Sequence, residues 1–252
     1  MEASRIAANL KSARERLGWS REVLAYHSGV SWSAISQIES GRRRDVRLTS
    51  LSALADALGV SVDYLVGSAA AATPPQLFEH RVLTYRSDEE FVAAVIPFLE
   101  EGMEKSHCLA LVLTEAKEAL VRDALGDRAG LVEFSNWADW YRSPNEALRR
   151  YSELVKQKLK LGAVWIRVVA EAAWDCPDPD IDTWTRYESL VNLAFLSAPA
   201  TIMCTYDERA FPAKVLANAL TTHPEVACGS ETTASATYRV PEDLLLDVVH
   251  PH

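Results

Sequence analysis

The first 66 residues place apolar side chains at helical spacing in short segments that glycines separate. Serine or threonine suits a helix N-cap and glycine suits a helix C-terminus, so these segments predict short capped helices. The predicted helices cover residues 4–17, 20–29, 31–41, 49–59 and 61–67, and Thr49 or Ser50 caps the fourth. A short turn containing Gly29 joins the second and third, which is the helix-turn-helix arrangement. We therefore assign residues 1–67 to a five-helix bundle that binds DNA.

The third predicted helix, residues 31–41, has two faces of different character. Ala34, Ile35 and Ile38 share one face, which would dock on the protein. The opposite face is polar and aromatic and would meet base edges in the major groove. The residues on that face are Trp32, Ser33, Ser36 and Gln37. We predict that they contact bases, and an amide such as that of Gln37 can pair with adenine.

Polar and basic residues next to this helix suit contacts with DNA phosphates. The predicted phosphate contacts are Arg21, Ser31, Arg42, Arg43, Arg44 and Arg47. The alternative is a surface helix followed by a solvated run of charges. The chain has a net charge of −9, but residues 1–66 carry nine basic and seven acidic residues (+2), while the remainder carries 17 basic and 28 acidic residues (−11). This asymmetry indicates different partners for the two segments, and a local basic patch is enough to bind phosphates.

Residues 68–79 are mostly small or apolar, include Pro74 and Pro75 and carry no charge before Glu79, which is typical of a linker. From residue 80 onward, apolar runs of strand length alternate with longer segments of helical period. The predicted strands are residues 81–85, 108–114, 131–134, 164–170 and 200–206, and the predicted helices are residues 88–105, 116–125, 145–161, 182–196 and 213–222. Residues 237–240 are expected to add an edge strand, and residues 241–249 a short helix. Buried strands separated by helices predict a three-layer α/β domain over residues 80–252, with a mostly parallel sheet.

A parallel sheet binds ligands at the carboxyl ends of its strands. The polar and aromatic residues that follow the predicted strands are Ser87, Thr114, Trp137, Trp140, Tyr141, Glu171, Tyr206 and Asp207. We expect these residues to line a crevice for a small apolar or cationic ligand. The alternative is that the aromatic residues only pack as a lid and that Glu188 pairs with Arg186 or Arg167.

The sequence contains no motif of catalysis or metal binding. It has no phosphate-binding glycine loop, nucleophile elbow or HExxH, and its four cysteines form no CxxC pair. His80, His107 and His223 are far apart in sequence, so we expect cap or surface histidines rather than ligands. We therefore expect no enzymatic activity, no cofactor and no metal. The scattered cysteines, together with the absence of a signal peptide or a long apolar run, indicate a cytoplasmic protein with no membrane partner.

The first domain resembles the Xre/Cro type of helix-turn-helix. Residues 10–25, 30–41 and 54–65 carry the resemblance, the last of them with the stretch GVSVDYL. The resemblance implies that the start of the third helix reads the major groove and that two copies bind two half-sites. Trp32 stands where a smaller polar residue is usual, and it could instead pack against backbone sugars. Glu39 stands where the family often has an acid, which implies an ion pair within the domain.

The second domain resembles the DcmR-like sensory (MEDS) domain. The resemblance is carried by residues 80–91, 97–104, 140–141, 186–189, 204–207 and 223–224. It implies a KaiC/RecA-like α/β core without the nucleotide loop, in a protein that senses small molecules or relays signals. The two domains together indicate a one-component transcriptional regulator that binds operator DNA and forms a homodimer through its second domain. The alternative is an interaction protein whose second domain binds a regulatory protein rather than a small molecule.

Overall fold

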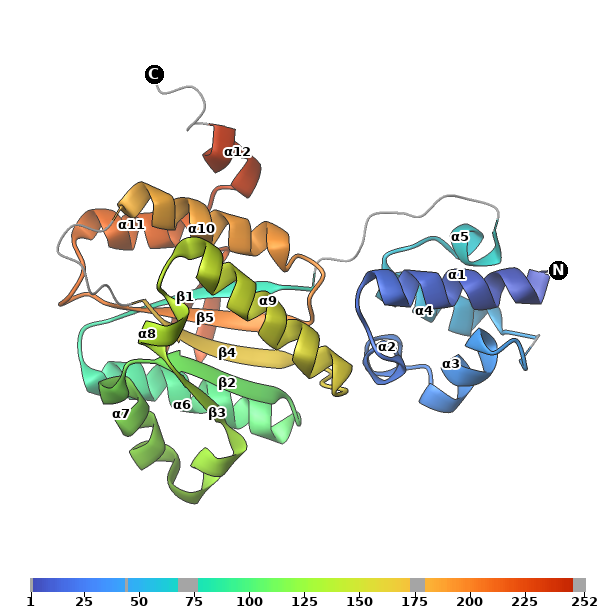
Figure 1. Ribbon diagram of the computed structural model, residues 1–252, viewed down its shortest axis with the longest axis horizontal. Helices are drawn as coiled ribbons and strands as arrows, with labels where there is room; N and C mark the ends of the chain where they lie inside the picture. The colour runs from blue at the N-terminus through green and yellow to red at the C-terminus, as the bar shows by residue number, and fades with distance from the viewer. Residues whose placement is uncertain (1, 44, 68–76, 173–179, 247–252) are drawn as a thin grey trace. The chain divides into compact units, whose positions relative to one another are not determined.

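The computed structural model describes residues 2–43, 45–67, 77–172 and 180–246, and the chain divides into two compact units. One unit contains the N-terminal helices and the other contains the sheet (Figure 1). Most of the predicted linker, residues 68–76, lies outside the described residues, so the domain limits at residues 67 and 80 stay a prediction.

The five predicted helices of the N-terminal unit are present. They are α1 (Glu2–Arg16), α2 (Arg21–Ser28), α3 (Trp32–Glu39), α4 (Leu48–Leu58) and α5 (Val62–Val66). The side chains of Ser20, Ser31 and Ser61 cap α2, α3 and α5 by accepting a hydrogen bond from the backbone N–H three residues later. The predicted cap of α4 is wrong, because α4 begins at Leu48 and therefore places Thr49 and Ser50 inside its first turn.

Each helix of the N-terminal unit contributes at least one fully buried apolar side chain to the core. Leu10, Leu24, Ile35, Leu54 and Leu65 belong to α1, α2, α3, α4 and α5 respectively, and all are fully buried. Helices this short are marginal in isolation, so their stability comes from packing of the apolar face. The inward face predicted for α3 is confirmed, since Ile35 and Ile38 are both buried.

The second unit is built on a seven-stranded sheet. Its strands are β1 (Glu79–Tyr85), β2 (Cys108–Leu113), β3 (Glu133–Asn136), β4 (Ile166–Glu171), β5 (Ala200–Asp207), β6 (Glu225–Cys228) and β7 (Glu231–Ala234). They lie in the order β3-β2-β4-β5-β1-β6-β7, and every pair is parallel except β6 with β7. The predicted mostly parallel sheet is therefore confirmed, and β5 lies at its centre between β4 and β1.

The edge strand expected at residues 237–240 is wrong. The backbone N–H of Arg239 bonds to the carbonyl of Thr221 at the end of a helix, so this segment is held outside the sheet. The edge is formed instead by the hairpin of β6 and β7, which turns at Gly229 with a φ of 57°. Strand β7 is exposed along its whole length, so it lacks the alternation of apolar and polar residues by which strands are recognised.

Helices cover both faces of the sheet (Figure 1). The helices that follow β1 are α6 (Asp88–Glu104), α7 (Glu115–Leu125), α8 (Trp137–Trp140), α9 (Pro144–Lys160), α10 (Ile181–Ala194), α11 (Ala213–Thr222) and α12 (Pro241–Leu246), with a 3₁₀ turn at Gly126–Leu131. Met203 of β5 packs in the core cluster with Phe91 and Leu99 of α6. Because side chains alternate along a strand, Cys204 and Tyr206 project to the opposite face, which α10 and α11 cover.

The longest helices described are α6 and α9, with 17 residues each, and both carry several charges. Among the described residues, no helix combines the length and the apolar character that crossing a membrane would require.

Candidate DNA-binding surface and candidate ligand pocket

Helix α3 presents most of its predicted base-contacting residues to solvent. Trp32, Ser33 and Gln37 are exposed, and Ser36 is half-buried. The pKa of Glu22, at the start of α2, is lowered by its own backbone N–H and by the Ser20 hydroxyl, while desolvation opposes them. A hydrogen bond with the Trp32 side chain adds a smaller lowering. Trp32 thus lies beside α2, with nearly half of its surface open.

The C-terminal end of α3 is anchored by a buried carboxylate. The Glu39 side chain is 1% exposed and pairs with Arg14 of α1 and with Arg21 at the first position of α2. Arg21 Nε donates to Glu39 Oε2 over 2.8 Å. The ion pair expected for Glu39 within the domain is therefore confirmed. Arg21 stays a predicted phosphate contact, because 38% of its side chain remains exposed.

The other predicted phosphate contacts lie around the same helix. The Ser31 hydroxyl accepts from the backbone of Ala34, Arg42 and Arg47 are exposed, and Arg43 is half-buried with Nε 3.3 Å from the carbonyl of Asp45. Arg44 lies outside the described residues. The positions of these side chains do not test whether they contact DNA, so their roles stay predictions.

The residues predicted to form one crevice divide into separate groups. Ser87 caps α6, and Asp207 binds Arg209, which also binds Asp88. The backbone N–H of Thr114 donates to Glu171 over 2.7 Å. Glu171 is buried, and its desolvation raises the pKa of this carboxyl although the Thr114 hydrogen bonds oppose the effect.

The aromatic members of the predicted crevice cluster around α8. Trp137 stacks on Tyr141, with ring centroids 5.9 Å apart. Trp140 is buried and packs on Tyr151 of α9 at 4.8 Å, which is the packing role considered as the alternative. Of the predicted crevice residues, Tyr141 and Tyr206 line a pocket on the α10 and α11 face of the sheet.

This pocket is small and has both aromatic and polar walls. Its lining includes Tyr141, Trp184, Glu188, Cys204, Tyr206 and Asn218. Its cavity volume is about 30 Å³, which suits one or a few small groups rather than a large ligand. Sequence reasoning did not select Trp184, Cys204 or Asn218, because they do not stand at the end of a strand.

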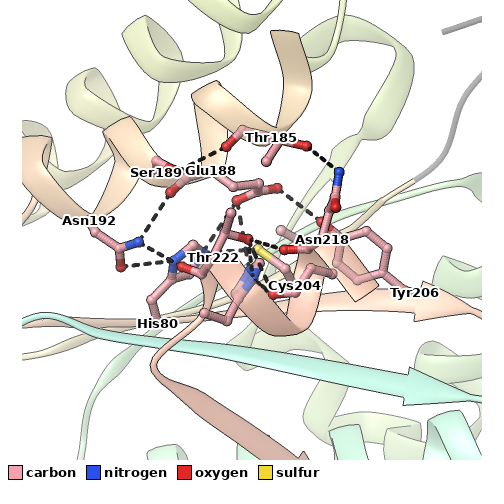
Figure 2. A network of polar contacts seen from close by, with 12 residues as sticks. His80, Thr185, Glu188, Ser189, Asn192, Cys204, Tyr206, Asn218 and Thr222 are labelled. Carbon is pink, nitrogen blue, oxygen red and sulfur yellow. Dashed lines mark hydrogen bonds and ion pairs between the residues drawn. The ribbon is translucent and has the colours of Figure 1, made fainter. Parts of the chain in front are cut away.

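A buried polar network includes three of the residues that line the pocket, Glu188, Cys204 and Tyr206 (Figure 2). Glu188 Oε1 accepts from the Tyr206 hydroxyl over 3.1 Å, and Glu188 Oε2 lies 3.5 Å from His80 Nε2. Burial raises the pKa of Glu188 to about 7, against the lowering effect of the Tyr206 hydrogen bond. The alternative in which Glu188 pairs with Arg167 is wrong, because Arg167 binds Glu101 on α6 instead.

Two histidines belong to this network. His80 lies in β1 and His223 directly follows α11, and their rings are 3.9 Å apart. His223 does cap α11, but both side chains are fully buried, so their placement on the surface is wrong. Burial lowers the pKa of His223 to about 4 and that of His80 well below its usual value, so both imidazoles are neutral at physiological pH.

Comparison with known families agrees with this arrangement. The family model described as MEDS, the MEthanogen/methylotroph, DcmR Sensory domain, matches residues 79–224, and a helix-turn-helix model matches residues 10–65. Both families are regulatory rather than catalytic. No curated protein and no solved structure matches the chain significantly. Since the first match covers more than half of the sequence, the chain belongs to the MEDS family and carries an Xre-type helix-turn-helix before its sensory domain.

Proposed function

We propose that this chain is a one-component transcriptional regulator that reads operator DNA with α3. The observation that carries the proposal is the two-sided character of this helix. Ile35 and Ile38 are buried, while Trp32, Ser33 and Gln37 are open to a partner. A helix held by its apolar face and by the buried Glu39 can present side chains to base edges without first having to be ordered.

DNA binding is tested with the full chain and duplexes from the region upstream of its own gene. Fluorescence anisotropy at low and at moderate salt compares these duplexes with unrelated duplexes of the same length. Tighter binding to one upstream sequence at both salt concentrations supports the proposal. Equal binding to all sequences that disappears at moderate salt contradicts it, since that behaviour is purely electrostatic.

We further propose that the pocket beside Glu188 binds a small apolar or cationic molecule. Tyr141 and Trp184 supply aromatic surface, and Glu188 supplies an acid. The pocket lies on the face of the sheet that α10 and α11 cover, and such a ligand alters operator affinity only if it binds one arrangement of the DNA-binding helices more tightly than another.

Ligand binding is tested by thermal-shift screening of the full chain against small amines, alcohols and halogenated hydrocarbons. A ligand at about 100 times its Kd adds about 2.7 kcal/mol of stability to the folded state. The stabilisation should be lost in Trp184→Ala, which removes an aromatic wall, and kept in Trp165→Phe, which lies outside the lining. Stabilisation by a protein partner alone would favour the interaction-protein alternative.

We also propose that the regulator binds its operator as a homodimer. One helix-turn-helix unit contacts a single half-site, and two half-sites about one helical turn apart require two copies. Sedimentation velocity of the full chain, alone and with its operator, measures the stoichiometry. Two chains for each duplex with a symmetric site support the dimer, and one chain for each duplex contradicts it.

A further inference from the structure

Four side chains with metal-binding donor atoms converge in the interior of the second unit. They are His80 of β1, Glu188 of α10, Cys204 of β5 and His223 after α11, and their donor atoms all lie within 4.8 Å of one another. All four side chains are buried. We propose that this cluster binds one divalent transition-metal ion of the zinc class, as a four-coordinate site in which both histidines ligate through Nε2.

Three of the six distances between donor atoms match a tetrahedral site, and the others are at most 4.8 Å. Zinc binds nitrogen, oxygen and sulfur at about 2.0–2.3 Å, which places neighbouring ligand atoms of a tetrahedron about 3.3–3.8 Å apart. His80 Nε2 lies 3.4 Å from Cys204 Sγ and 3.5 Å from Glu188 Oε2, and His223 Nε2 lies 3.8 Å from Glu188 Oε2. The two nitrogen–oxygen distances exceed those of hydrogen bonds, about 2.7–3.2 Å, so a shared proton does not explain them.

The neighbours of both histidines direct Nε2 toward the centre of the cluster. His223 Nδ1 lies 2.7 Å from the carbonyl oxygen of Ala219, which can only accept, so Nδ1 carries the proton. His80 Nδ1 lies 3.1 Å from Asn192 Oδ1. The Asn192 amide nitrogen donates to the carbonyl of Thr222 over 2.8 Å, which fixes Oδ1 as the acceptor for His80 (Figure 2). Such outer hydrogen bonds orient metal-binding histidines in known sites.

The third oriented ligand is the carboxylate of Glu188. Its Oε1 accepts from the Tyr206 hydroxyl, so Oε2 is left to face the two Nε2 atoms. Among the described residues, Glu188 Oε2 and His223 Nε2 are buried polar atoms without a hydrogen-bond partner. Leaving a buried polar atom without a partner is unfavourable, so two such atoms that face each other indicate a shared binding partner.

The charges of the cluster balance around a divalent ion. A thiolate at Cys204 and a carboxylate at Glu188 supply two negative charges, while the histidines stay neutral as ligands. The site would then be neutral as a whole, which a buried environment favours. Glu188 and Cys204 also line the proposed ligand pocket, so the ion would lie at its wall.

The test measures metal content directly and does not depend on DNA binding or ligand sensing. The full chain is purified without an affinity tag, and all first-row transition metals are quantified by plasma mass spectrometry. We expect about one ion for each chain, and at least a tenfold loss of metal in Cys204→Ser and in His223→Gln. The matched control is Cys228→Ser, which removes an exposed thiol and should keep the metal.

A second measurement uses the wild-type chain alone, so it remains decisive if a variant fails to fold. Chelator-treated protein is titrated with Co²⁺, and we expect a thiolate-to-cobalt charge-transfer band that saturates at about one equivalent. A titration without that band overturns the proposal. Metal content that Cys204→Ser and His223→Gln leave unchanged, with both variants folded by circular dichroism, also overturns it, because the metal would then be bound elsewhere.

Discussion

The guanidinium group of Arg14 and the carboxylate of Glu39 form a two-pronged ion pair, with Nε 2.6 Å from Oε1 and Nη2 3.0 Å from Oε2. This pair joins α1 to the end of α3, and Arg14 Nη1 also donates to the carbonyl of Trp19 over 2.7 Å. A buried pair of this kind contributes little net stability as a unit, but removing one partner leaves an uncompensated buried charge. The position of α3, the proposed DNA-binding helix, therefore depends on a carboxylate that is buried inside the N-terminal unit.

Glu39→Ala should destabilise the N-terminal unit by about 3–5 kcal/mol, because it leaves Arg14 buried without its carboxylate. Hydrogen exchange of peptides from α1 and α3 measures this effect as a loss of protection. The control is Asp56→Ala, which removes an exposed carboxylate from α4 and should cost less than about 1 kcal/mol. Equal protection of both variants would show that Glu39 does not anchor α3.

Gln37→Ala should weaken binding at one operator position only, by about 1–3 kcal/mol, because a base-reading amide is lost there. Arg42→Ala should weaken binding to all sequences. The slope of log affinity against log salt concentration should fall by about 1, as expected for one lost phosphate contact. Anisotropy titrations with single-base operator variants distinguish the two effects. Lys214→Ala, an exposed basic residue of the sensory unit, is the charge control and should change neither. Uniform weakening by Gln37→Ala would assign this residue to positioning.

Local sequence patterns predicted most elements because local physics determines them. The caps Ser20, Ser31 and Ser61 and the buried strand β5 were found from hydroxyl side chains and apolar runs. Strand β7 was missed because its residues are exposed, so no burial pattern marks it. Its pairing with β6 depends on the turn at Gly229 and on the edge that β1 provides.

The buried cluster could not be predicted from spacing, because its members come from four elements. His80 lies on β1, and two residues later Val82 is the register partner of Cys204 on β5. Helices α10 and α11 bring Glu188 and His223 to the same face of the sheet. One signal was available in the sequence. His80 occupies an alternating position between Phe78 and Val82, both buried, so a polar residue was directed into the core. Only the packing of α10 and α11 reveals what it meets there.

The sensory unit should lose stability in acid as the carboxylate of Glu101 becomes protonated. Partial burial opposes its ionisation, but hydrogen bonds from Arg167 and Lys105 outweigh that effect and lower the pKa of Glu101 to about 2. Since this is below the usual 4.5, the stabilisation is complete above pH 4.5 and is lost as the pH falls toward 2. The side chain is 43% exposed, so solvent screening limits the effect to about 1 kcal/mol.

Urea unfolding of the wild type and Glu101→Gln, between pH 7 and pH 2.5, measures this contribution as a difference in the slope of the free energy of unfolding against pH. His107 also contacts Arg167, at 3.2 Å, and its pKa is lowered to about 4 by burial and by Arg167. The charge of Glu101 also raises the pKa of His107, so the difference between the two proteins reports Glu101 together with its effect on His107. Parallel stability curves for the two proteins below pH 4.5 would contradict the prediction.

Gly102→Ala should destabilise the sensory unit although alanine favours helices. The added methyl group would lie 2.5 Å from Leu109 Cδ2 and 2.9 Å from Arg167 Cδ, and overpacking of this kind costs about 1–3 kcal/mol. The gain in helix propensity is about 1 kcal/mol, which is less than most of the overpacking range, so the net change in the free energy of unfolding is a loss. The control is Gly130→Ala, where nothing lies within 4 Å. Thermal unfolding should separate the two variants, and a melting temperature for Gly102→Ala at or above that of the wild type would contradict the prediction.

Asn192→Leu should lower metal affinity by about 10- to 100-fold, because removal of an outer partner allows the His80 ring to turn. The affinity is measured by competition with a chromophoric chelator, after the fold has been checked by circular dichroism. Ser189→Ala is the matched control, since this buried hydroxyl donates to the Thr185 carbonyl on the same helix and can be removed without touching His80. If both variants bind zinc as tightly as the wild type, Asn192 does not orient His80. A loss confined to Asn192→Leu would show that the amide orients the cluster, through the His80 ring and through the Thr222 carbonyl next to His223, because a general weakening of α10 would affect both variants.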